Sequence, residues 1–458
     1  MDAGFRLGSE RKLKIEKLCC RVLSICLLLF SSVFLSPADA QSLQPSTAAQ
    51  SGPVRQRWIE DLNLKGGSAD NPLFTDTVLG VDSPIRRDLF RHGILFRMQA
   101  SGAYIQNTLR APVAADAQTY TGDRQFGDYA FNPILSADLR QFGLWKTQLN
   151  IDGEIQQGSW DPAQPKAATI SSLYLYHEFG EDRAEMKIGY LTVDFQFIGL
   201  TVGGQAASGA QGVYAVLPYE VGLSHGAVEA PAVTLKYRWD SGFYVKGAAQ
   251  RAEDPGPEET ALGRDAVGLR FAPSGDKLVL VGEAGLKRAA TAKALGAWYR
   301  VGYITNNTPY TSLRTGLKKS GNYCAYLLAD HQAWRTDEAG PQHGVFMGGS
   351  AMVVPADLDV YRLYYEARIY DVAPFQRRPN DFASVVASYT AISQDRLHAL
   401  AAANKTYWRA SDSVTGSYTL RLARGTYMGL GLSYVNGPAV TPKTPSALTF
   451  TAQTSVFF

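Results

Sequence analysis

Cysteine is nearly absent from most of this sequence. Of the four cysteines, Cys19, Cys20 and Cys26 lie within the first 40 residues, and only Cys324 follows them. A single thiol can form neither an intrachain disulfide framework nor a zinc cluster. Histidine is also scarce, at six residues, and no HExxH zinc pattern occurs. The sequence therefore predicts no metal site and no cofactor.

A large charge of one sign is absent too. The 458 residues include 45 Lys and Arg against 42 Asp and Glu, which gives a net charge of +3. A surplus this small and evenly spread gives no basic patch for DNA or RNA, so we exclude nucleic acid as a main partner. The 24 tyrosines and 43 glycines recur in short stretches without a sustained helical period, as in an all-β protein.

Long apolar runs are missing beyond the N-terminus, which excludes a helical membrane protein. The one run, residues 22–35, follows five basic side chains and precedes the small residues Ala38 and Ala40. This order predicts a secretory signal peptide over residues 1–40, cleaved after Ala40. The alternative, an N-terminal anchor helix, needs about 20 apolar residues. Cleavage leaves a nearly neutral chain with 39 basic and 38 acidic side chains.

Strands with a period of two make up the rest of the sequence. Residues 145–157 are the clearest case, with Gln148, Asn150 and Asp152 on one face and Leu149 and Ile151 on the other. Similar alternation occurs at 233–250, 361–369, 413–422 and 448–458. A soluble β-sandwich also alternates, but strands of about 9 to 13 residues match a tilted membrane crossing better. Aromatic residues near the strand ends resemble interfacial girdles.

The last strand ends in Phe458, as outer-membrane barrels of Gram-negative bacteria typically do for their insertion machinery. We therefore predict a transmembrane antiparallel β-barrel of about 16 strands over residues 92–458, with short periplasmic turns. A seventeenth candidate, residues 266–271, is assigned to an outer loop because it would invert every later turn. The strands are expected to begin at Ile94, Phe131, Trp145, Thr169, Arg183, Ala232, Gly242, Lys277, Ala294, Asn322, Gly344, Val360, Phe382, Ser411, Thr426 and Ala447.

Two long segments fall outside these strands. Residues 41–91 are predicted to be a periplasmic or plug-like segment. Residues 191–231, rich in Gly, Ala and Ser, lie between the fifth and sixth strands, where a loop that folds inward would narrow the pore. A disordered outer loop is the alternative for this second segment.

Enzyme motifs are weak. Residues 222–226 match GxSxG, but no helix follows the serine as a nucleophile elbow requires. Asp330 and His331 are neighbours in a strand and so point to opposite faces. Asp152 and Glu154 lie about 7 Å apart on one face, within the range of glycosidase carboxylates, although such pairs are common in a polar lumen. We predict no enzymatic activity; a barrel hydrolase or an adhesin is a remote alternative.

Several short motifs occur in a shared order: residues 87–89 with 93–96, 187–191 with Asp194, 295–299, 326–332 and 378–381. In these motifs the sequence resembles the carbohydrate-selective porin family, the OprB-type outer-membrane porins. The resemblance covers most of the chain after about residue 85. It implies a monomeric or loosely associated sixteen-stranded barrel in a Gram-negative outer membrane that passes sugars, monosaccharides such as glucose among them, by facilitated diffusion. The expected partners are small neutral sugars, outer-membrane lipid and the insertion machinery. Association into a homo-oligomer is left as an open alternative.

A barrel of sixteen strands is wide enough for water, so its selectivity depends on lumen side chains and inward loops. Mixed charges suit a neutral polyhydroxyl solute, and the rings of Tyr174, Tyr176 and Trp298 offer stacking faces. Ten basic against six acidic lumen residues mildly favour anions, so an anion-preferring or general diffusion porin is the alternative. The candidate substrate-binding residues are Arg97, Arg124, Lys146, Asp152, Glu154, Tyr174, Tyr176, Lys187, Arg238, Trp298, Arg300, Arg362 and Glu366.

Overall fold

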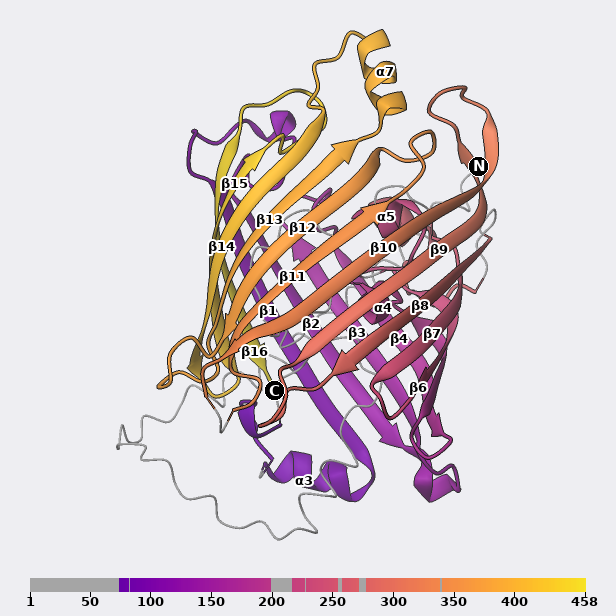
Figure 1. Cartoon of the computed structure of the whole chain (residues 1–458), viewed down its shortest axis with the longest axis vertical. Coiled ribbons are helices and arrows are strands. Elements are labelled where there is room, and N and C mark those ends of the chain that lie inside the picture. Colours follow the sequence, from indigo (N-terminus) through magenta and orange to yellow (C-terminus); the bar gives the residue numbers. More distant parts are fainter. Residues whose placement is uncertain are drawn as a thin grey trace, which may run out of the picture. The chain divides into compact units, whose positions relative to one another are not determined.

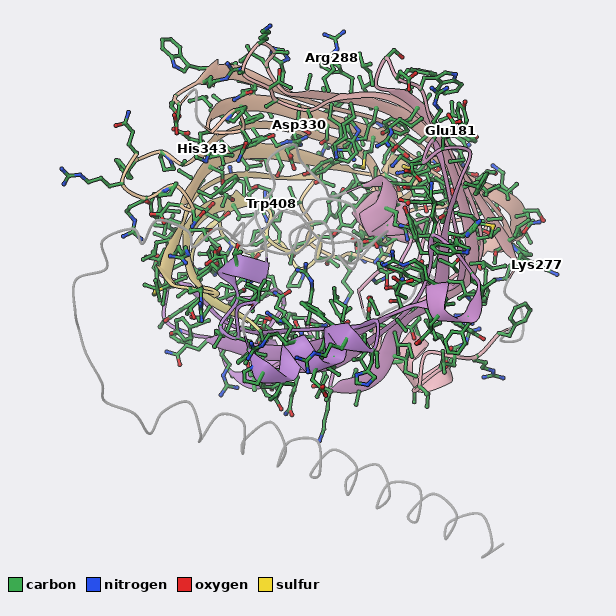
Figure 2. All side chains as sticks on the ribbon, turned by 90° about the horizontal axis from the view of Figure 1, so that it is seen from below. Glu181, Lys277, Arg288, Asp330, His343 and Trp408 are labelled. Atoms are coloured by element: carbon green, nitrogen blue, oxygen red, sulfur yellow. The ribbon has the colours of Figure 1, made fainter. Side chains whose placement is uncertain are left out.

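The structure, a computed structural model, describes residues 74–81, 83–198, 216–226, 228–253, 258–271, 277–337 and 340–458. The predicted signal peptide and most of the predicted segment 41–91 lie outside these residues. In the described part of the chain, antiparallel strands close into one barrel, because each strand pairs with its neighbours in sequence and β1 pairs with β16. The strands form a ring in Figure 2.

The sixteen strands of this barrel confirm the predicted number. Their bounds are β1 Ile94–Asn107, β2 Phe126–Asp138, β3 Thr147–Gly158, β4 Ala167–Phe179, β5 Ala184–Leu191, β6 Ala230–Arg238, β7 Phe243–Arg251, β8 Leu278–Arg288, β9 Ala297–Thr311, β10 Lys318–Arg335, β11 Gly344–Val353, β12 Tyr361–Val372, β13 Phe382–Ile392, β14 Ala410–Ala423, β15 Thr426–Asn436 and β16 Ala447–Phe457.

Alternation along each strand separates two faces. Leu327 of β10 and Tyr365 of β12 are exposed on the outer wall, whereas Tyr326 and Tyr364 are buried on the inner wall. Directly paired residues share a face, so the register of one strand fixes that of the next around the barrel. Residues 266–271 form no strand, as predicted.

Five strands begin earlier than predicted, and β2 and β10 differ most, by five and four residues, for different reasons. β2 begins at Phe126 instead of Phe131. An apolar side chain, Phe126, is buried on the inner face while Gly127 lies on the outer face, so the first residues lack the expected alternation of polar inward and apolar outward side chains. β10 begins at Lys318 instead of Asn322. Its first residues, 318–321, contain no apolar side chain, and they form a strand by pairing with the end of β9.

Short turns gather at one end of the barrel. Residues 180–183 join β4 to β5, and residues 424–425 join β14 to β15. In bacterial outer-membrane barrels the end with short turns faces the periplasm. Figure 1 shows helix α3 (Pro84–Arg91) and the C-terminus at this end and helix α7 (Gln394–Ala402) at the other. Among the described helices, none is long and apolar enough to cross a membrane.

The described part of the N-terminal segment, residues 74–91, closes onto the periplasmic end. The Asp76 carboxylate accepts hydrogen bonds from Arg421 at 2.5 and 2.8 Å and from the Tyr427 hydroxyl. Val78 donates its backbone N–H to Phe457, at 2.8 Å. Gly425 has a φ of +70°, and a Cβ there would lie 2.5 Å from the nitrogen of Val78. The segment therefore needs glycine at this turn to approach β15 and β16.

The connection between β5 and β6 folds into the barrel, which is the first of the two alternatives given for residues 191–231. Helices α4 (Asp194–Phe197) and α5 (Val216–Glu220) belong to it. Phe197, Leu217 and Leu223 are buried in one cluster with inward side chains of β4 and of β6 to β12. The Tyr219 hydroxyl donates to Asp194 at 3.0 Å and so joins the two helices. Residues 199–215 lie outside the described residues.

Candidate functional site

Glu283 of β8 is the centre of one charged group on the inner wall. Its carboxylate lies 3.3 Å from the Lys246 ammonium group of β7. It also accepts hydrogen bonds from the hydroxyls of Tyr244 and Tyr326, at 2.8 and 2.9 Å. A buried carboxylate is costly unless it is paired and hydrogen-bonded, and these three donors meet that need.

Asp330 of β10 is the centre of a second charged group. The Arg368 guanidinium of β12 donates to both carboxylate oxygens, at 2.8 and 2.9 Å, and the Tyr370 hydroxyl donates at 3.1 Å. Arg300 lies 4.0 Å from the same carboxylate, and Arg368 also bonds to Glu366 at 2.5 Å. Asp330 is not among the predicted binding residues, although it shares the inward face of β10 with Tyr326, and this alternation was the signal that could have found it.

The candidate bases divide into two sets. Arg97, Lys187 and Arg300 are buried, and the odd and even alternation places them on the inner wall. Lys146 and Arg238 lie instead at the periplasmic rim, where Lys146 bonds to the Asp182 carboxylate at 2.6 Å and Arg238 to its carbonyl at 3.3 Å.

Two further candidate bases lie near the outer end. Arg124 is exposed in the loop between β1 and β2. Arg362 is exposed where the register of β12 against β13 shifts between Tyr361 and Leu363. Lys146, Arg238 and Arg362, three of the ten predicted lumen bases, thus lie outside the central wall, as does Arg124, which was predicted as a binding residue but was not among the ten.

Two of the three aromatic candidates pack against the inward loop, and the third is covered by side chains of the wall. Tyr174 and Tyr176 are buried in its cluster. Trp298 carries the Arg300 guanidinium 3.7 Å and the Lys287 ammonium group 4.1 Å from its ring centre, and its indole N–H donates to Tyr244 at 2.8 Å. These rings therefore stabilise the wall and the loop in this structure, and they present no open face to a sugar.

Polar side chains of β1 to β3 form the more accessible part of the inner wall. Gln99 of β1 pairs with Asn132 of β2, and Asp152 of β3 follows on the same face. Together with Glu154, these side chains are partly exposed. Ser172 donates to Asp152 at 2.5 Å. The predicted acids Asp152, Glu154 and Glu366 are all partly exposed as residues, but the Glu366 side chain is 7% exposed and the Oδ1 atom of Asp152 is buried.

A pair of carboxyl groups lies where the loop meets the outer end of β12. Glu220 of α5 accepts the backbone N–H groups of Val360 and Tyr361, both at 3.1 Å, and Asp359 accepts from Asn322 at 2.8 Å. Burial and the neighbouring Asp359 raise the pKa of Glu220 to about 8. Burial also raises the pKa of Asp359 to about 7.

The residues of the weak enzyme motifs have structural contacts. The Ser224 hydroxyl, in the GxSxG match, donates to the carbonyl of Leu191 and to Gln250, at 3.0 and 3.1 Å. His331 bonds to Tyr299 at 3.0 Å, away from Asp330. In the described part of the chain, no three His, Cys, Asp or Glu side chains are grouped to hold a metal ion.

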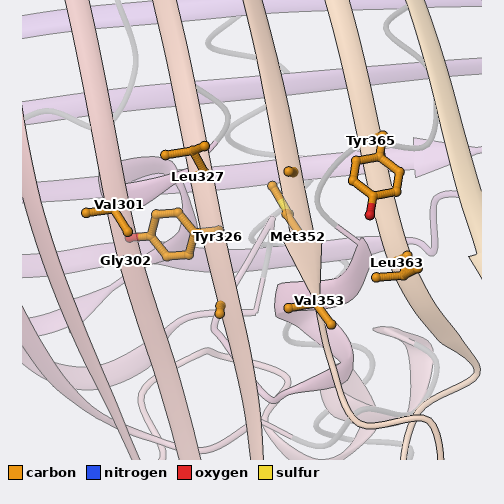
Figure 3. Close-up of a pocket in the computed structure, with 10 residues that line it drawn as sticks. Val301, Gly302, Tyr326, Leu327, Met352, Val353, Leu363 and Tyr365 are labelled. Atoms are coloured by element: carbon orange, nitrogen blue, oxygen red, sulfur yellow. The ribbon is translucent and has the colours of Figure 1, made fainter.

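A shallow groove lies on the other side of the wall. It is lined mainly by outward side chains of β9 to β12, including Val301, Leu327, Leu363 and Tyr365 (Figure 3). Because Leu327 and Tyr365 are exposed on the outer wall, this groove faces lipid and does not belong to the path of a solute.

A closed barrel of sixteen strands, with paired charges on its inner wall and a loop folded into it, defines an outer-membrane porin. The model of the carbohydrate-selective porin family, OprB, matches residues 92–458. The chain therefore belongs to the OprB family of carbohydrate-selective porins, which are channels of the Gram-negative outer membrane rather than enzymes.

Solved structures agree on the fold. The high-pH structure of OprB from Pseudomonas putida has a TM-score of 0.70 at 15% identity, over 84% of this chain and 98% of that chain. The low-pH structure of the same protein has a TM-score of 0.53 at 12% identity, with the same coverage. Among curated proteins, none matches this sequence.

Proposed function

We propose that this porin passes small neutral sugars, monosaccharides such as glucose among them, along the polar wall of β1 to β3. The observation that supports this proposal is the pairing of opposite charges between nearby strands of the inner wall. Lys236 faces Glu185 at 3.1 Å, Lys246 faces Glu283, and Arg368 is shared between Asp330 and Glu366. Because these charges neutralise one another within the wall, the lumen has no strong net field, and the polar side chains of β1 to β3 offer the hydrogen bonds, an arrangement that suits a neutral polyhydroxyl solute.

An anion-preferring channel needs several bases without acids at its narrowest part. Beside the inward loop, Lys246 and Arg300 each have an acid within 4.0 Å. This pairing favours the sugar channel over the anion channel.

The experiment is single-channel recording of the refolded protein in a planar bilayer. We expect an open channel whose current is blocked, saturably, by glucose, together with weak ion selectivity. A conductance that ignores sugars but depends on the anion would transfer the function to the anion-preferring alternative. No conductance at all would indicate a plugged barrel with another role.

Three further assignments belong to this proposal. Residues 1–40 would be removed as a signal peptide during export, and residues 41–91 would remain at the periplasmic side. Phe458 would be read by the barrel-insertion machinery, because it ends an amphipathic last strand. Mass spectrometry of the exported protein tests the first assignment, and the yield of folded Phe458→Ala tests the last.

A further inference from the structure

Three cations of the inner wall converge on α4, the first helix of the inward loop. Lys187 of β5 donates to the side-chain oxygen of Gln196 at 2.8 Å. Lys246 of β7 donates to the backbone oxygen of Gln196, and its ammonium group lies 4.1 Å from the centre of the Phe197 ring. Arg300 of β9 donates to the backbone oxygen of Phe197 at 3.1 Å. The helix is thus held from three separate strands.

Two of these contacts satisfy the C-terminal end of α4. The last carbonyl groups of a helix have no partner within the helix, and they carry a partial negative charge. Gln196 and Phe197 supply two such carbonyls, and cations from the wall donate to both. The wall therefore caps the helix, a role usually filled by residues that follow the helix in sequence.

The three cations are turned away from water. Lys187 is 6% exposed, the Lys246 side chain 9%, and the Arg300 side chain 0%. Glu283 and Asp330 balance the charge of Lys246 and Arg300. A solute in the channel therefore meets the helix that these cations hold, and not their charge.

We propose that Lys187, Lys246 and Arg300 are positioning residues that hold α4 against the wall, set the width of the channel and do not bind the solute. The inference deepens the proposed function and rests on it only where sugar block is measured. Channel width is measurable with salt alone, so the two claims can fail separately.

The first test is a pair of variants at one contact. Lys187→Met removes the donor and its charge, while Gln196→Ala removes the acceptor without changing any charge. We expect both to raise single-channel conductance and open-channel noise in KCl, and the double variant to add little to either, because both remove the same contact. The reversal potential in a salt gradient should stay close to that of the unmodified protein.

Lys236 provides the matched control. It lies on β6, between β5 and β7, and bonds to Glu185 on the wall at 3.1 Å. Its side chain is 29% exposed, so Lys236→Met removes a charge that ions can meet. We expect this variant to shift the reversal potential toward cations and to leave the noise unchanged.

The second test replaces a whole charge pair. Lys246→Met combined with Glu283→Gln is neutral overall, and the amide oxygen that Glu283→Gln introduces can still accept from Tyr244 or Tyr326. Loss of the anchor should raise the dissociation constant for glucose roughly two- to tenfold, the lower part of the range of coupling between contacting residues. Heat-modifiable mobility in SDS gels verifies that the barrel of this double variant has closed. If the double variant fails to fold, Gln196→Ala still tests whether α4 is held by the wall.

Two results would overturn the proposal. One is Gln196→Ala with unchanged conductance and noise. The other is Lys187→Met that shifts only the reversal potential, which would make Lys187 a ligand for ions. If the unmodified channel shows no sugar block, the proposed function fails, and the conductance measurements still test the positioning role.

Discussion

At the residue scale, Asp152 and Glu154 are two acids on the part of the wall that is proposed to meet a sugar. Both are partly exposed on the inner face of β3. A hydrogen bond to a charged group contributes about 1.5 kcal/mol, which corresponds to roughly a tenfold change in affinity. We therefore expect Asp152→Asn to raise the dissociation constant for glucose about tenfold, measured by titration of current block. The asparagine can still accept from Ser172, so the wall itself should persist.

Asp182→Asn is the control for this prediction. Asp182 lies in the turn between β4 and β5, where it bonds to Lys146 at 2.6 Å on the exposed rim. Its replacement should leave the block by glucose unchanged. Equal loss of block in the two variants would show that overall charge, rather than contact with Asp152, controls sugar affinity.

Alternation along strands predicted which residues face inward, and this held for Lys187, Arg300 and Glu366. It could not predict what covers them. Trp298 looked like a stacking platform, but Arg300, two residues along the same face of β9, and Lys287, its partner on β8, both lie over its ring. The contact between Arg300 and Phe197 joins residues about one hundred positions apart, and it depends on how the loop folds back. The alternation within each strand therefore identified the residues of the inner wall but not the loop that packs against them.

At the element scale, strand periodicity was sufficient for the number and order of strands but not for all their ends. Pairing extended β2 and β10 into residues that lack the expected alternation. The inward direction of the loop was one of two open alternatives, because Gly, Ala and Ser fit both a disordered loop and a packed one. The apolar contacts of Phe197, Leu217 and Leu223 favoured the packed form.

The attachment of α5 to the outer end of β12 should depend on pH. Glu220 titrates near pH 8 beside Asp359 near pH 7, and burial raises the pKa of both. A raised pKa means that the docked loop binds protons more tightly than the released loop. Docking is therefore strongest in acid and weakens as the pH rises from about 4.5, the usual value, toward 8. Asn322 is the neutral neighbour of this pair.

We expect channel noise and conductance to increase between pH 6 and pH 9 as both carboxyl groups ionise. Glu220→Gln should remove most of this dependence, since it cannot ionise and can still accept one backbone N–H group. Glu181→Gln, in the exposed turn between β4 and β5, serves as the control. A pH response that survives in Glu220→Gln would assign the response to another group.

At the scale of the whole molecule, the barrel closes where β1 meets β16, and residues 74–91 run across that junction. The segment enters β1 through α3, while Val78 bonds to Phe457 at the end of β16 and Asp76 bonds to Arg421 and Tyr427 of β14 and β15. It therefore links the first strand to the last three. Burial raises the pKa of Asp76, but the hydrogen bonds from Arg421 and Tyr427 outweigh burial and lower it overall.

Asp76→Asn should weaken this closure. The variant loses the charge that Arg421 neutralises, and a hydrogen bond to a charged group contributes about 2 kcal/mol. We expect the folded barrel of this variant to unfold at a lower urea concentration than the unmodified protein. Its mobility in SDS gels measures the fraction that remains folded. The lowered pKa means that the stabilisation is present above the usual value for aspartate and is lost in acid below it, so the difference from the unmodified protein should shrink as the pH falls below about 4. Asp88→Asn, on the exposed side of α3, is the control and should unfold like the unmodified protein. Equal effects of the two variants would assign the loss of stability to net charge instead of to the contact with Arg421.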